Sequence, residues 1–289
     1  MYTYKRKNLP KHTITFTVSL PWKELETAKD QSFKELCKTL QVEGFRKGKV
    51  PKDIAKKHIP AADIYQHAIR SLLPKIYEEI VKKENIKPII SPKIDLKEAE
   101  ENKDWTIVFT VAERPTVDLK KYKEQIKKAK AELKKSDIWV PGKDTKEDEK
   151  AVERKKQLEF QAALDALMKE ATVEVPDLII EDELEQRLSR LVDDIQRVGL
   201  TMESYLKSKN KTKEQLNNEL KKEIENTYRL EFILQEIAEQ EKITVDDAEL
   251  ETMFKAVKDD KERELAKRNA YYYASLLRKQ KTLDYIQGM

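Results

Sequence analysis

Residues 12–20 read His-Thr-Ile-Thr-Phe-Thr-Val-Ser-Leu, and this stretch decides the fold class of the front of the chain. Its apolar residues occupy every second position: Ile14, Phe16, Val18 and Leu20. Because successive side chains of a β-strand point to opposite faces, the alternation predicts a strand with one buried face. Pro21 then stands where helices often begin.

The stretch that follows predicts a helix, because apolar residues recur from Trp22 to Leu40 with helical spacing before Gly44. Four further elements are predicted by the same reasoning: helices over 53–58 and 63–83, and strands over 89–96 and 105–111. The order strand-helix-helix-helix-strand-strand predicts an α+β domain over residues 1–115. The basic segment Lys5-Arg6-Lys7 is interpreted either as a solvated tail or as added affinity for RNA.

Composition points to a mostly helical protein. Charged residues make up 39% of the 289 residues, and only 5 residues are glycine, against a usual share of about 7%. Because tight turns need glycine at positive φ, β-propellers, TIM barrels, Rossmann domains and half-barrels of the FKBP type are disfavoured. The apolar periodicity argues against wholesale disorder.

The rest of the chain divides into a linker and a helical domain. Residues 116–147 are predicted to be a lysine-rich linker or solvated helix, since 120–135 hold eight lysines. Residues 148–289 predict an all-α, multi-helix domain with arm-like helices. Its expected features are helices over 213–240 and 261–287, a helix capped by Thr244, and a leucine stripe over 184–198. The stripe is interpreted either as a seam between two arms or as a client surface.

Charge is distributed unevenly along the chain. Residues 1–115 carry 23 Lys+Arg and 16 Asp+Glu, whereas residues 144–289 carry 26 and 34. A basic front and an acidic back indicate that the front meets an anionic partner. Nucleic-acid affinity from such a front would fall with salt.

No catalytic or metal site is predicted. His58 and His67 have no ligands at metal-site spacing, and Cys37, the only cysteine, has no acid–base partner nearby in sequence. The single thiol suits a reducing compartment. No signal peptide and no membrane span are predicted, and the expected location is the cytoplasm.

The sharpest motif is Gly44-Phe45-Arg46-Lys47-Gly48-Lys49-Val50-Pro51. It places two of the five glycines four residues apart, around one aromatic and three cations. The cations can pair with phosphates or carboxylates, and the phenyl ring can stack or insert. A charged loop between two helices without function is the alternative. A P-loop is rejected, because the spacing is one residue short and Val50 replaces the Ser/Thr.

The octapeptide resembles the ribosome-docking signature of the trigger factor family, Gly-Phe-Arg-x-Gly-Lys-x-Pro. Other parts of the chain also resemble that family: the strand that ends with 14–18, the helix before the octapeptide, and the segments 83–88, 174–184, 230–242 and 244–253. The resemblance implies that seven residues dock on the ribosome: Gly44, Phe45, Arg46, Lys47, Gly48, Lys49 and Pro51. The chain departs from the family in one respect. Only 34 residues separate Val117 from Val152, too few for the usual FKBP-like prolyl isomerase domain.

The resemblance implies an ATP-independent chaperone without cofactor, which docks at the tunnel exit of the large ribosomal subunit on ribosomal protein and rRNA. It would hold nascent or unfolded polypeptides; the client-binding residues are not identified, and a weak homodimer is left open. The alternatives are a prolyl isomerase of the same family, an RNA-binding or ribosome-assembly module, and a free periplasmic chaperone. The missing domain disfavours the first alternative, and the long acidic helical part disfavours the second.

Overall fold

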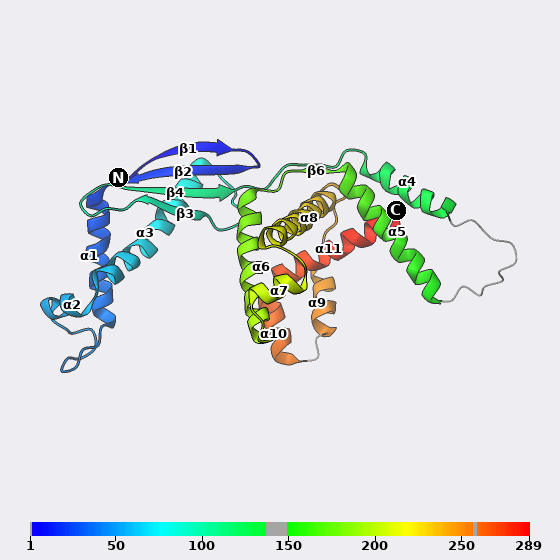
Figure 1. The fold of residues 1–289 in the computed structure, drawn as a ribbon. Helices are drawn as coiled ribbons and strands as arrows, with labels where there is room; N and C mark the ends of the chain where they lie inside the picture. Colours follow the sequence, from blue (N-terminus) through cyan, green and yellow to red (C-terminus); the bar gives the residue numbers. More distant parts are fainter. Residues whose placement is uncertain (1, 137–148, 257–258) are drawn as a thin grey trace. The chain divides into compact units, whose positions relative to one another are not determined.

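The computed structural model describes residues 2–136, 149–256 and 259–289 (Figure 1). It forms two compact units. Unit 1 comprises Met1–Arg114 with Pro176–Asp182, and unit 2 comprises Pro115–Val175 with Glu183–Met289. The predicted fold class, an α+β part followed by a helical part, is confirmed.

Unit 1 is built on an antiparallel four-stranded sheet with the strand order β1-β2-β4-β3. The strands are β1 (Thr3–Leu9), β2 (Thr13–Leu20), β3 (Lys93–Glu98) and β4 (Trp105–Ala112). The helices are α1 (Trp22–Thr39), α2 (Lys52–His58) and α3 (Ala61–Glu84). The alternating residues of β2 face those of β4, with Phe16 opposite Phe109, and both rings are fully buried. Together with Leu73, Ile76 and Ile80 of α3 they form the core of this unit.

Strand β1 is absent from the order that the sequence predicts. The basic segment 5–7 lies inside this strand, and the Tyr2 and Tyr4 hydroxyls donate to Glu79 and Glu84 of α3, each at 2.7 Å. Most side chains of β1 are exposed, so this edge strand lacks the apolar alternation that reveals a strand in sequence. The solvated-tail interpretation of these residues is therefore wrong.

Strand β3 begins at Lys93, four residues later than predicted. Pro92 precedes it and lacks the N–H that a ladder needs. The residues before it form only an isolated bridge, between Pro88 and Glu113.

Unit 2 is helical apart from a two-stranded ribbon of β5 (Val117–Asp118) and β6 (Thr172–Val173). Its helices are α4 (Tyr122–Ser136), α5 (Glu149–Glu170), α6 (Asp177–Arg197), α7 (Met202–Ser208), α8 (Lys213–Gln240), α9 (Asp247–Ala256), α10 (Asp260–Arg268) and α11 (Ala270–Gly288). The first residues of α6 belong to unit 1. Buried residues of α4, α5, α8 and α11 form the main core, among them Ile126, Leu167, Ile233, Ile237 and Ile286.

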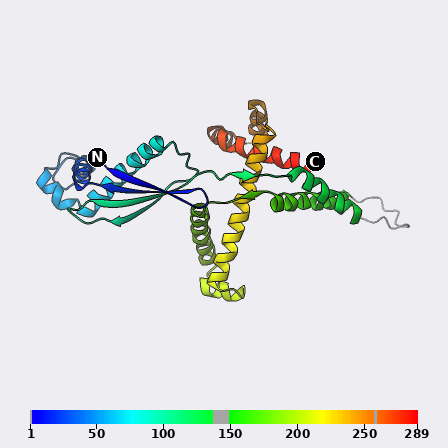
Figure 2. The same cartoon turned by 90° about the horizontal axis from the view of Figure 1, so that it is seen from above.

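Residues 117–136 are not a solvated linker, contrary to the prediction for 116–147. They form β5 and α4, and α4 runs beside α5 (Figures 1 and 2). Tyr122 and Ile126 are buried one turn apart, and Lys130 continues the same stripe. The Lys130 ammonium donates to the carbonyls of Ile286 and Gln287, at 3.0 and 2.8 Å. A lysine thus fills a core position by binding the end of α11, where cations are favoured. Residues 137–147, the rest of the predicted linker, lie outside the described residues.

Glu241, which follows α8, ties three elements of unit 2 together. Its carboxylate accepts hydrogen bonds from Tyr122 at 3.1 Å and Tyr285 at 2.7 Å, and it pairs with Lys123 at 2.7 Å. The Lys123 ammonium, followed by the Tyr285 hydroxyl, holds the pKa of Glu241 below its ordinary value. These bonds attach α4 to the ends of α8 and α11.

Three details of the helical part differ from the prediction. Asp246, not Thr244, caps α9, because its side chain accepts from the Glu249 N–H while Glu249 reciprocates. The last predicted helix is divided at Asn269 into α10 and α11. The leucine stripe of 184–198 is only partly buried: Ile195 is buried, whereas Val198 is 70% exposed.

Candidate functional site

The octapeptide forms the loop between α1 and α2, at the end of α1 (Figure 1). We call residues 44–51 the docking loop. Two consecutive β-turns shape it: the Phe45 N–H donates to the Val42 carbonyl at 3.0 Å, and the Lys49 N–H donates to the Arg46 carbonyl at 2.9 Å. The third residue of each turn is a glycine at positive φ, Gly44 at 85° and Gly48 at 74°. The four-residue spacing of the glycines is therefore the spacing of two adjoining turns.

Gly48 also holds the loop against α1. Its N–H donates to the Leu40 carbonyl at 3.1 Å, and a Cβ added at this glycine would lie 2.7 Å from the backbone oxygen of Lys38. No such crowding exists at Gly44, where nothing lies within 4 Å. The second glycine is thus required for close approach as well as for its φ.

The base of the docking loop is anchored in a small apolar cluster. Val50 is buried with Ala55 and Ile59, and Phe33, Leu36 and Cys37 of α1 pack against them. Pro51 precedes α2, and its carbonyl accepts from the Ala55 N–H at 2.9 Å. The loop is therefore fixed at its base by packing on both flanking helices.

The tip of the docking loop is exposed. Phe45 is 38% exposed, unusual for a phenyl ring in a protein whose other phenylalanines are mostly covered. Arg46, Lys47 and Lys49 are also exposed, and within the described residues none of the three makes an ion pair. A rigid loop thus presents one aromatic ring and three cations to solvent, a combination suited to a partner with anionic groups and an apolar or stacking surface.

The substitutions Gly48→Ala and Gly44→Ala can separate two effects: the steric contact between the loop and α1, and the backbone strain of an alanine at positive φ. Both residues have positive φ, and an L-residue there costs about 1–2 kcal/mol. Only Gly48→Ala adds a contact with the Lys38 carbonyl. We expect Gly48→Ala to lower the melting temperature of unit 1 more than Gly44→Ala and to speed amide exchange in 38–50. Equal effects of the two substitutions would contradict the anchoring role of Gly48.

The other chemically distinctive residues do not converge on a site. Cys37 is half-buried in the apolar cluster, His58 is exposed, and His67 lies 3.7 Å from Glu35. Across 2–136, 149–256 and 259–289, no group of three His, Cys, Asp or Glu side chains is placed to hold a metal ion.

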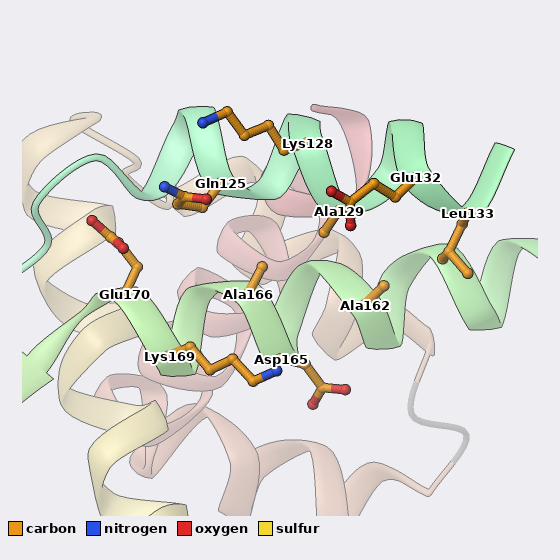
Figure 3. Close-up of a pocket in the computed structure, with 10 residues that line it drawn as sticks. All are labelled: Gln125, Lys128, Ala129, Glu132, Leu133, Ala162, Asp165, Ala166, Lys169 and Glu170. Atoms are coloured by element: carbon orange, nitrogen blue, oxygen red, sulfur yellow. The ribbon is translucent and has the colours of Figure 1, made fainter. Parts of the chain in front are cut away.

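A groove of about 570 Å³ runs between α4 and α5 in unit 2 (Figure 3). Alanines of the two helices face one another along it, namely Ala129, Ala162 and Ala166, while Glu132, Asp165 and Lys169 are among its polar lining residues. Because alanine side chains are small, they let the two helices approach closely.

Unit 2 exposes several large apolar side chains. They lie on α5, near the turn after α6, and along α10 and α11: Leu158, Val198, Leu200, Leu265, Tyr271, Tyr272 and Leu276. Tyr271 is 90% exposed, whereas Tyr273 packs edge-on against Phe254. Periodicity alone cannot distinguish these exposed positions from covered ones, because exposure depends on which helices pack together.

Among the helices of the described residues, none combines the length and the apolar character that crossing a membrane requires.

Comparison with known proteins gives consistent matches. Residues 2–140 match the family model described as bacterial trigger factor protein (TF), and residues 144–286 match the model of its C-terminus. The trigger factor of Staphylococcus carnosus (strain TM300) is 38% identical over 118 residues, 40% of this chain and 27% of that protein. That of Lacticaseibacillus casei (strain BL23) is 35% identical over 136 residues, 47% of this chain and 30% of that protein.

The fold is also similar to that of a solved trigger factor chaperone, described as promiscuous in substrate recognition, with a TM-score of 0.61 and 14% identity over 99% of both chains. The chain spans less than a third of the length of the curated relatives that it matches. Only residues 141–143 separate the two segments that match the family models. Since two models of one family together account for nearly all of its residues, the chain belongs to the bacterial trigger factor family.

Proposed function

We propose that the chain is a molecular chaperone that docks at the tunnel exit of the large ribosomal subunit and holds nascent or unfolded polypeptides without ATP, in the cytoplasm. In this proposal residues 1–115 bind the ribosome and residues 148–289 bind clients. The docking loop is the observation that carries it, because a loop fixed by Gly48 and Val50 presents Phe45 and its neighbouring cations to solvent. The docking residues are the seven named above from the resemblance.

The exposed apolar side chains of unit 2 support the client-holding part. They include Tyr271, Tyr272 and Leu276 on α11 and Val198 and Leu200 after α6. Apolar surface of this kind gains free energy from any apolar segment it covers. We therefore propose weak binding that tolerates many client sequences.

Prolyl isomerase activity is not part of the proposal. The two segments that match the family models adjoin one another almost directly, leaving 141–143 between them.

Client holding is tested with a refolding protein that aggregates on dilution from denaturant. We expect the chain in excess to suppress the light scattering in the absence of ATP, and to act equally on clients rich or poor in proline. A variant with Phe45, Arg46 and Lys47 replaced by alanine should suppress aggregation as the wild type does, because its changes lie in unit 1. A strict requirement for ATP, or no suppression above that of serum albumin, would contradict this part of the proposal.

A further inference from the structure

Positive charge at the docking end of unit 1 extends well beyond the docking loop. Residues 38–58 contain seven lysines and arginines but only two acidic residues. All seven cations are exposed: Lys38, Arg46, Lys47, Lys49, Lys52, Lys56 and Lys57. Three of these lie on α2, which no motif marks as functional. We call Lys52, Lys56 and Lys57 the α2 lysine row.

The α2 lysine row is held rigidly beside the docking loop. Ala55 and Ile59 of α2 are buried in the cluster that also anchors Val50. The three lysines are nevertheless exposed, and Lys52 and Lys56 are neighbours on the helix surface, because residues four apart are about 5–6 Å apart on a helix. Within the described part of the chain, no ion pair neutralises these three lysines.

The density of positive charge points to a polyanion as the partner. Six of the seven cations are lysines, whose ammonium groups act as point charges on flexible stems and need no fixed pairing geometry. A run of like charges is matched by a polyanion of regular spacing, and a nucleic-acid backbone is such a polyanion.

We infer that the α2 lysine row binds the phosphate backbone of ribosomal RNA, as a second contact beside the docking loop. The inference rests on the proposed ribosome docking and extends it. The docking loop supplies the aromatic and short-range contacts, and the α2 lysine row supplies salt-dependent, sequence-independent affinity. Each neutralised phosphate releases counterions, so its contribution appears in the slope of log affinity against log salt.

The test is the triple variant Lys52→Gln, Lys56→Gln and Lys57→Gln in the full chain, with binding to ribosomes measured from 50 to 200 mM salt. Glutamine keeps helix propensity close to that of lysine. Three lost phosphate contacts should flatten the log–log slope by roughly two to three. The matched control replaces Lys23, Lys75 and Lys87, exposed lysines of unit 1 far from this end in sequence, by glutamine. The control should keep the wild-type slope.

Protein-free large-subunit rRNA is the second probe. The α2 variant should bind it more weakly than both the control and Phe45→Ala. A slope equal to that of the control overturns the inference. The inference is also overturned if the α2 variant binds ribosomes more weakly but binds protein-free rRNA as well as the control does. That result would mean that the α2 lysine row contacts an acidic protein surface.

These outcomes are distinguishable from failure of ribosome docking itself. If the wild type does not bind ribosomes but its rRNA affinity depends on the α2 lysine row, the proposed function fails and the RNA contact stands. If ribosome binding depends on Phe45, Arg46 and Lys47 but not on the row, docking stands and the inference fails.

Discussion

Replacing Phe45, Arg46 and Lys47 together by alanine is expected to abolish co-sedimentation with ribosomes while leaving unit 1 folded. The three side chains are exposed, whereas the residues that shape and anchor the docking loop, Gly48 and Val50, are untouched. The binding energy of an interface is concentrated in a few residues, often aromatic or cationic ones, so truncating those residues removes a large share of it. Circular dichroism and an unchanged melting temperature establish that the variant is folded.

Dissecting the triple variant separates its two kinds of contact. Phe45→Ala should weaken binding by a similar factor at every salt concentration, because burial or stacking of a ring is not screened. Replacing Arg46 and Lys47 should flatten the log–log salt slope by roughly two if each neutralises one phosphate. If they meet acidic side chains of a ribosomal protein instead, the loss is a few kcal/mol with a gentler slope.

The control for this experiment removes the same kinds of side chain from unit 2. Tyr271, Arg268 and Lys261 are exposed there, and their replacement by alanine takes away one aromatic ring and two cations. This variant should co-sediment like the wild type. The docking model is wrong if the triple variant of the docking loop, shown to be folded, still co-sediments as well as this control.

The sequence was most informative where one face of an element is buried and the other is solvated. Strand β2 and strand β4 carry an unbroken apolar alternation because both lie inside the sheet of unit 1, facing α3. Strand β1 pairs only on one side and has mostly exposed side chains. Its backbone pairs with β2 along its whole length, and Tyr2 and Tyr4 add hydrogen bonds to Glu79 and Glu84, some 80 residues away, which no local pattern contains.

The docking loop shows the same division between local and non-local information. The glycine spacing and the run of cations are local, and they suffice to mark residues 44–51 as a tight, exposed turn. The reason for Gly48 in particular is its approach to the Lys38 carbonyl, which depends on how α1 ends. The exposed apolar side chains of unit 2 are also a non-local property, because whether a helix face is covered depends on which other helices pack against it.

Helix α4 gives the second large expected effect: Ile126→Ala should destabilise unit 2 by about 2–5 kcal/mol, the usual cost of truncating a buried isoleucine. Ile126 is fully buried against α5, α8 and α11. Lys127 is its exposed neighbour on the same helix, and Lys127→Ala should change stability by no more than about 0.5 kcal/mol. The pair compares a core position with a surface position within one lysine-rich segment.

Amide hydrogen exchange is the measurement, because it reports on each helix separately in a chain of two units. A loss of 2 kcal/mol raises exchange of the most protected amides about 30-fold, and we expect this rise in α5, α8 and α11 as well as in α4. Such spreading follows from the bonds of Lys130 to the end of α11 and of Glu241 to α4, which make α4 part of the unit rather than an attached segment. Two results would contradict this expectation: a rise in exchange confined to α4, or equal effects of Ile126→Ala and Lys127→Ala. Either would mean that α4 behaves as the solvated linker that its lysines indicate, and that its packing contributes little to the stability of unit 2.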